Sequence, residues 1–184
     1  MKRLATALAL AGSCVLATSV IPTPAFALET FEAKMQASEA VSQASLDMFE
    51  AFGFKRLKPG QYLWRDVPAS AGPERVVVSL GDQLAFLYRG DELVAVSTIS
   101  TGKDEKPTPT GIFSVLDKKP FYRSKKYDNA PMPWMQRIDD YGIALHGGFN
   151  PGYPASHGCI RLPVDFAKKL FTVTGVGTPV YIGA

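Results

Sequence analysis

The amino-acid sequence predicts a mainly β protein, with one sandwich or barrel domain of mostly antiparallel strands and minor helices. Two observations support this prediction. Short runs of β-branched and aromatic residues recur from residue 58 onward, and tight turns such as Gly81-Asp82 and Arg89-Gly90-Asp91 separate several of them. The chain has 184 residues, of which 46% are hydrophobic and 20% charged, so it is too apolar to be disordered and long enough to bury a core.

The first 27 residues have the pattern of a secretory signal peptide. Positive charge at Met1–Arg3 is followed by the uncharged stretch Leu4–Val20, and Ala25-Phe26-Ala27 has the small-x-small form of a cleavage site. Pro22 and Pro24 follow the apolar stretch, which favours a cleaved signal over a permanent membrane span. We therefore expect export to the periplasm or cell envelope.

Cleavage after Ala27 would remove Cys14 and leave Cys159 as the only thiol. The alternative is lipidation at Cys14, because Leu10–Ser13 loosely resembles a lipoprotein processing site. The apolar sequence continues past Cys14, which favours cleavage after Ala27. In an oxidising compartment, a lone cysteine is either buried and inert or a reactive thiol.

Residues 28–73 are expected to form a helical or irregular N-terminal segment ahead of the main domain, residues 74–184. Apolar residues spaced through 29–52 predict one or two amphipathic helical pieces ending near Gly53. The pattern does not choose between a lid, a spacer and a docking arm for this segment.

The main domain is expected to consist of short strands and one short helix. The expected strands cover residues 61–64, 75–80, 83–88, 92–99, 111–116, 143–145 and 179–182, and the helix covers 165–171. Residues 117–140, rich in proline and aromatic residues, predict a long surface excursion, in which Tyr122 and Trp134 either stack on a substrate or anchor the loop. Its lysine pairs, Lys118-Lys119 and Lys125-Lys126, are interpreted as solvated surface charges.

Charge does not suggest nucleic-acid binding, since 20 Lys and Arg oppose 17 Asp and Glu without a long basic run. The residues with catalytic chemistry instead gather near Cys159. The only two histidines, His146 and His157, both lie within 13 residues of it. A cysteine nucleophile needs a nearby base, and backbone N–H donors for the oxyanion. Neighbouring glycines allow the close approach of a substrate.

Two alternatives to a nucleophile are an inert core thiol and a zinc site built from His146, His157 and Cys159. The Gly, Ser and His neighbours of Cys159 predict an open, electropositive setting, which argues against the inert thiol. The spacing of the three residues lacks a recognised zinc pattern.

The segment Ser156-His157-Gly158-Cys159-Ile160-Arg161, with His146 upstream, resembles the signature of the L,D-transpeptidase (YkuD-type) catalytic domain. The resemblance covers roughly residues 74–183. Further stretches that resemble the family are Val76–Tyr88, Ser100-Thr101-Gly102, Pro107–Gly111 and Gly177–Val180.

This resemblance implies an exported cysteine transpeptidase that acts on the tetrapeptide stems of peptidoglycan. Cys159 would attack the carbonyl that joins the third stem residue, a diamino acid, to the terminal D-alanine. An acyl-thioenzyme would form, D-alanine would leave, and the acyl group would pass to an amine. That amine would belong to a second stem, giving a 3→3 cross-link, or to an envelope protein, anchoring it to the wall.

The resemblance also implies roles for single residues. His146 would be the general base and then the acid, and the Gly147 carbonyl would orient its imidazole. Backbone N–H groups near His157, Gly158 and Cys159 would hold the oxyanion.

Four side chains are expected to bind substrate or shape the pocket: Ser156, Arg161, Tyr153 and Trp134. Arg161 stands where the family often has Asn, and it either contacts substrate or braces the loop. The gap from His146 to Cys159 is shorter than in many members, so substrate preference does not transfer directly.

The resemblance implies no metal or organic cofactor, and it makes carbapenems the expected covalent inhibitors. The expected processes are peptidoglycan biosynthesis, cell wall organisation and cell shape. Three alternatives stay open: an L,D-carboxypeptidase or amidase that uses water as the acceptor, an unrelated wall-directed cysteine peptidase, and a non-catalytic wall-binding module. The sequence leaves the acyl acceptor and the oligomeric state open.

Overall fold

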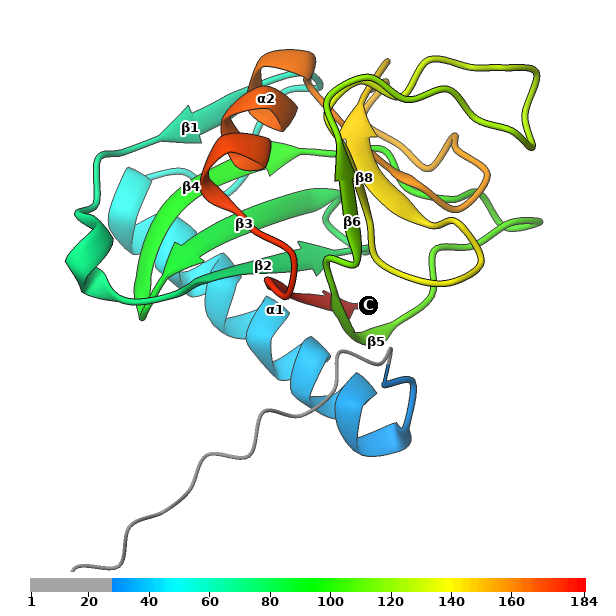
Figure 1. Cartoon of the computed structure of the whole chain (residues 1–184). Helices are drawn as coiled ribbons and strands as arrows, with labels where there is room; N and C mark the ends of the chain where they lie inside the picture. The colour runs from blue at the N-terminus through cyan, green and yellow to red at the C-terminus, as the bar shows by residue number, and fades with distance from the viewer. Residues whose placement is uncertain (1–27) are drawn as a thin grey trace, which may run out of the picture.

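The computed structural model describes residues 28–184, and the predicted signal peptide and Cys14 lie outside this range. Two β-sheets and two α-helices make up the described chain (Figure 1). The six-stranded sheet contains, in spatial order, β1 (Tyr62–Trp64), β4 (Glu92–Thr98), β3 (Leu84–Arg89), β2 (Glu74–Ser79), β10 (Pro179–Gly183) and β5 (Gly111–Ser114). The four-stranded sheet contains β6 (Asp117–Lys119), β7 (Met135–Arg137), β8 (Ala144–Gly147) and β9 (Ile160–Leu162).

Parallel pairing occurs once in each sheet, between β2 and β10 and between β8 and β9, and the other strand pairs are antiparallel. In the β8–β9 pair, His146 lies opposite Arg161. Cys159 directly precedes β9, so this pair of strands brings the distant His146 and Cys159 segments to neighbouring positions.

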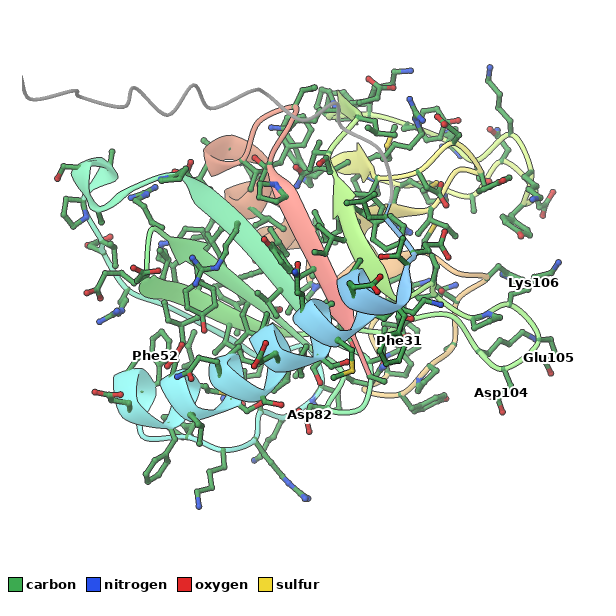
Figure 2. The ribbon with its side chains drawn as sticks, turned by 90° about the horizontal axis from the view of Figure 1, so that it is seen from below. Phe31, Phe52, Asp82, Asp104, Glu105 and Lys106 are labelled. Atoms are coloured by element: carbon green, nitrogen blue, oxygen red, sulfur yellow. The ribbon has the colours of Figure 1, made fainter. Side chains whose placement is uncertain are left out.

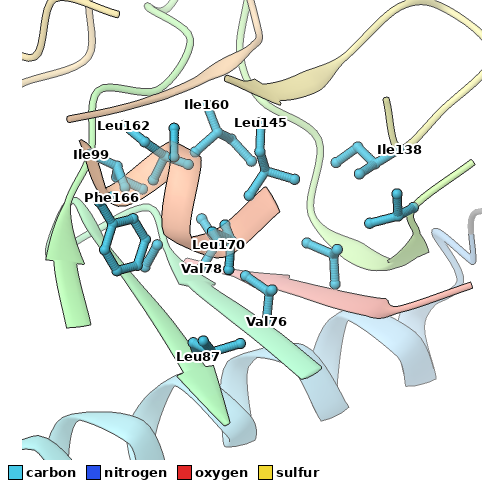
Figure 3. Packing of buried hydrophobic residues seen from close by; sticks show 14 of the residues in the cluster. Val76, Val78, Leu87, Ile99, Ile138, Leu145, Ile160, Leu162, Phe166 and Leu170 are labelled. Atoms are coloured by element: carbon cyan, nitrogen blue, oxygen red, sulfur yellow. The ribbon is translucent and has the colours of Figure 1, made fainter. Parts of the chain in front are cut away.

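The main core lies between the two sheets and the helix α2 (Val164–Val173). Figure 3 shows Phe166 and Leu170 of α2 among the aliphatic side chains of β2, β8 and β9. Phe166, Leu145 and Ile160 are almost fully buried. The strands that hold the candidate site are therefore supported from behind by close-packed side chains.

The helix α1 (Phe31–Phe52) runs across the opposite face of the six-stranded sheet (Figures 1 and 2). Thr30 accepts the N–H of Ala33 at its start, and Gly53 ends it in the left-handed conformation. The Tyr88 hydroxyl donates to Asp47 of α1 at 2.6 Å. Residues 28–52 are thus packed on the domain, which excludes a free spacer. Among the helices of residues 28–184, none has the length and hydropathy needed to cross a membrane.

Most expected strands appear within a few residues of their predicted bounds, but the excursion predicted over 117–140 is wrong at both ends. Its ends form β6 and β7, which pair with each other in the second sheet. Both strands have only three residues, and such short strands leave little alternating pattern to recognise. The strand β9 and the short 3-10 helix Ala69–Ala71 were not predicted either.

Candidate active site

The imidazole of His146 is fixed by its own strand. The residue is 7% exposed, and Nδ1 lies 2.9 Å from the carbonyl oxygen of Gly147. Because a carbonyl only accepts hydrogen bonds, Nδ1 carries the proton and a neutral ring leaves the Nε2 lone pair free. The Gly148 N–H, which shares a peptide group with the Gly147 carbonyl, donates to the Leu162 carbonyl at 2.9 Å and so holds the orienting carbonyl in place. His146 is therefore arranged to accept a proton at Nε2.

The Cys159 side chain is half-buried and borders the same cavity as His146. Its Sγ lies 3.7 Å from the Gly142 carbonyl oxygen, within the range of a weak S–H donor. The Ala144 N–H also faces the sulfur and favours its ionised form. Backbone groups of residues 142–144 thus hold the thiol on one side.

Electrostatics favour a neutral thiol beside a neutral imidazole. Burial raises the pKa of the Cys159 thiol above its ordinary value, and Asp139 adds to this rise, while Ala144 and Arg161 oppose it. Burial lowers the pKa of His146, and Arg161 lowers it further, against the opposing effect of the Gly147 carbonyl. Burial thus affects the pKa of the Cys159 thiol more than the nearby Arg161 guanidinium does.

Alkylation of Cys159 by iodoacetamide is expected to accelerate steadily between pH 7 and about pH 9, because this thiol ionises above its ordinary pKa of about 8.5. Turnover should instead persist down to below about pH 6.5, since the lowered pKa of His146 keeps it in its basic form there. Rates measured across this range test both statements. An alkylation rate already at its maximum at pH 6 would indicate a preformed thiolate–imidazolium pair and contradict them.

Asp139 is a buried carboxylate near the thiol that the sequence analysis missed. Its Oδ1 accepts the N–H groups of Gly142 and Ile143, both at 2.7 Å. These bonds shape the turn that presents the Gly142 carbonyl to Cys159. An Asp followed three residues later by Gly, just before a buried strand, is a turn signal that was available in the sequence.

The loop before Cys159 uses one of the expected oxyanion donors internally. Ser156 is 1% exposed, and its hydroxyl donates to the Cys159 carbonyl at 2.6 Å while accepting the Gly158 N–H at 3.1 Å. The prediction that the Gly158 N–H holds the oxyanion is therefore wrong, because that group is already bonded. Within residues 28–184, no hydrogen bond engages the N–H of His157 or of Cys159, so these two remain as candidate donors.

A cavity of about 1400 Å³ opens in front of the two candidate catalytic side chains. Its basic lining side chains are Lys106, Lys125, Lys126 and Arg161, and the acidic ones are Glu105 and Asp128. The loop that carries Glu105 and Lys106 projects from the body of the molecule (Figure 2). Tyr122 also lines the cavity, and Tyr127 stacks on His157 with ring centroids 4.6 Å apart.

The structure corrects the predicted roles of two aromatic side chains. Trp134 packs against Phe171, with ring centroids 5.5 Å apart, and is not among the described residues that line the cavity. Tyr153 is 62% exposed and also lies outside this lining; only its carbonyl is used, as acceptor for the Ser100 hydroxyl. Both residues belong to loops near the site, but neither ring lines the cavity.

Of the four lysines predicted to be solvated surface charges, Lys119, Lys125 and Lys126 are exposed as expected, and Lys118 is the exception. Lys118 is half-buried, and its Nζ donates to the Phe171 and Thr174 carbonyls at the end of α2. Lys125 and Lys126 border the cavity. A sequence pattern marks such lysines as polar but does not show which face of the fold they reach.

Within the described range 28–184, no three His, Cys, Asp or Glu side chains are placed to hold a metal ion together. The ring of His157, one of the three residues of the alternative zinc site, stacks on Tyr127.

Residues 73–182, most of the described chain, match the L,D-transpeptidase catalytic domain family (YkuD). YkuD of Bacillus licheniformis is 33% identical over 117 residues, which are 60% of this chain and 66% of that protein. An L,D-transpeptidase from Mycobacterium smegmatis has a similar fold, with a TM-score of 0.57 and 22% identity over 60% of this chain and 58% of that one. The L,D-transpeptidase LdtMt1, solved in complex with imipenem, gives a TM-score of 0.55 and 23% identity over 59% of this chain and 58% of that one.

The match thus spans 58–66% of the length of these relatives. The family match covers well over half of the chain itself. The protein belongs to the L,D-transpeptidase catalytic domain family.

Proposed function

We propose that this chain is an exported L,D-transpeptidase that acts on peptidoglycan tetrapeptide stems with Cys159 as its nucleophile. The observation that supports it most is the parallel β8–β9 pair, which brings His146, with Nε2 free to accept a proton, and Cys159 to one cavity. Family membership supplies the reaction class.

In the first half-reaction, Nε2 of His146 takes the thiol proton as Sγ of Cys159 attacks the carbonyl before the terminal D-alanine. The carbonyl oxygen becomes an oxyanion, for which the N–H groups of His157 and Cys159 are the available donors. The C–N bond then breaks, the imidazolium protonates the leaving amine, and an acyl-thioenzyme and free D-alanine remain.

In the second half-reaction, an amine attacks the thioester while His146 removes its proton. The new amide bond forms, and the proton returns to the thiolate as it leaves. A second stem peptide as acceptor gives a 3→3 cross-link, and an amine of an envelope protein gives a covalent anchor. The basic side chains on the cavity lining are suited to the carboxylates of a stem peptide.

Carbapenem inhibition follows from the same chemistry, since the strained ring offers an activated carbonyl to Cys159. The imipenem complex of the similar fold is in accord with this expectation. We also propose that the chain acts in the periplasm or cell envelope, on the basis of its first 27 residues.

The experiment is to incubate the purified chain with a disaccharide-tetrapeptide and to identify the products by mass spectrometry. A dimer short of one D-alanine is the expected product. A tripeptide alone would show water as the acceptor, and thus an L,D-carboxypeptidase. A folded chain that leaves the tetrapeptide unchanged would contradict the proposal.

A further inference from the structure

A buried hydroxyl outside the cavity controls the peptide group that precedes the nucleophile. Thr108 is buried and is not among the described residues that line the cavity. Its Oγ1 donates to the Gly158 carbonyl at 2.8 Å and accepts the Gly102 N–H at 2.9 Å. Thr108, in the loop before β5, thus bonds both the loop that carries the nucleophile and Gly102, in the segment that follows β4.

The bond to the Gly158 carbonyl has a consequence for Cys159. A trans peptide is planar, and its C=O and N–H point in opposite directions. Residues 28–184 contain no cis peptide. With the Gly158 carbonyl held toward buried Thr108, the N–H of Cys159 must point away from Thr108.

Rotation of this peptide would be easy without such a bond. Gly158 has φ of +112°, a conformation that glycine adopts readily, so its backbone supplies little resistance of its own. Ser156 holds the preceding peptide through the Gly158 N–H. Thr108 and Ser156 together fix the two peptide groups that flank Gly158.

Backbone contacts also join the segment of Thr101 and Gly102 to the loop before Cys159. A Cβ on Gly102 would lie 2.8 Å from the Gly158 Cα, so the two glycines touch. The Thr101 carbonyl accepts the N–H groups of Ala155 and Ser156 at 3.0 and 2.9 Å. Two of the segments that resemble the family outside the Cys159 signature, Ser100-Thr101-Gly102 and Pro107–Gly111, therefore form the support on which the nucleophile loop rests.

We propose that Thr108 is a positioning residue that aims the Cys159 N–H at the oxyanion, an inference that rests on the proposed function. Its hydroxyl does not touch substrate and acts through the Gly158 peptide. Loss of the hydroxyl should therefore impair attack on carbonyl groups and leave the reactivity of the thiol unchanged.

The test compares Thr108→Val, which keeps the branched shape, with Thr108→Ser, which keeps the hydroxyl. The control is Thr110→Val, because Thr110 is a half-buried neighbour for which the structure shows no side-chain hydrogen bond. Two reactions are measured for each variant: acylation of the full chain by imipenem, followed by intact mass, and alkylation by iodoacetamide. Only the first develops an oxyanion.

We expect Thr108→Val to slow imipenem acylation by about 10- to 100-fold, somewhat less than the loss of a whole oxyanion donor. Alkylation should stay within about twofold of the parent rate. Thr108→Ser and Thr110→Val should acylate within about threefold of the parent. With tetrapeptide, Thr108→Val should lower kcat with little change in KM.

The inference is overturned if Thr108→Val acylates at the parent rate, or if acylation and alkylation fall together, which would indicate a general structural role. Thermal unfolding of each variant checks that the compared proteins are folded. A parent chain that reacts with imipenem but converts no tetrapeptide would contradict the proposed function, and the acylation comparison would still decide the role of Thr108.

Discussion

Replacing Cys159 with alanine is expected to abolish D-alanine release from a tetrapeptide, with a fall of at least about a hundredfold. The acyl-thioenzyme cannot form without the sulfur, and no second thiol lies within residues 28–184. His146→Ala should cause a fall of at least about a hundredfold too, because the thiol is neutral at rest and then lacks a group to take its proton. Released D-alanine, measured against time, gives the rates.

A matched control separates chemistry from folding. Glu50→Ala changes an exposed side chain on α1, which covers the sheet face opposite the main core, and should leave the rate unchanged. Cys159 is half-buried and its weak bond to Gly142 contributes little, so Cys159→Ala should unfold near the parent temperature. A folded Cys159→Ala protein that releases D-alanine at more than about a tenth of the parent rate would exclude Cys159 as the nucleophile.

Gly102→Ala is the second change with a large expected effect, because no space exists for the added methyl group. Its Cβ would lie 2.1 Å from the Lys106 carbonyl oxygen and 2.8 Å from both Gly158 Cα and Thr108 N. All three are backbone atoms, so relief requires the chain itself to move. We expect the free energy of unfolding to fall by about 3 kcal/mol or more, and imipenem acylation to slow because Gly158 is displaced.

Gly175→Ala is the control for this substitution. Open space surrounds Gly175, where a Cβ would meet no atom within 4 Å. Its free energy of unfolding should stay within about 1 kcal/mol of the parent value. Denaturant unfolding of both variants provides the comparison. Equal stability of Gly102→Ala and Gly175→Ala would show that the close approach of Gly102 to Gly158 is not a constraint on the fold.

Much of the fold could be predicted because its long strands have strong local signals. The hairpin of β2 and β3 consists of runs of β-branched, aliphatic and aromatic residues that turn at Gly81-Asp82, and α1 and α2 show helical spacing. The strands β6 and β7 could not be predicted, because they are short and mostly charged or polar, so they depend on their partners more than on their own sequence.

The sequence was enough to predict which residues form the candidate site, but only part of their burial and orientation. His146 and Cys159 were identified from residue type and spacing, and the bond from His146 to the Gly147 carbonyl is present. The turn held by Asp139 had a local signal in the sequence, but burial of the thiol depends on how the two sheets meet. The same is true of Trp134 and Tyr127: both are aromatic residues of one loop, and only packing places one ring against the core and the other onto His157.

Formation of an acyl-thioenzyme at Cys159 is tested by the intact mass of the chain quenched early in its reaction with a disaccharide-tetrapeptide. We expect an adduct equal to the donor minus D-alanine, located to Cys159 by digestion, lost on treatment with hydroxylamine and absent from Cys159→Ala. An adduct on another residue, or D-alanine release by Cys159→Ala at the parent rate, would contradict it.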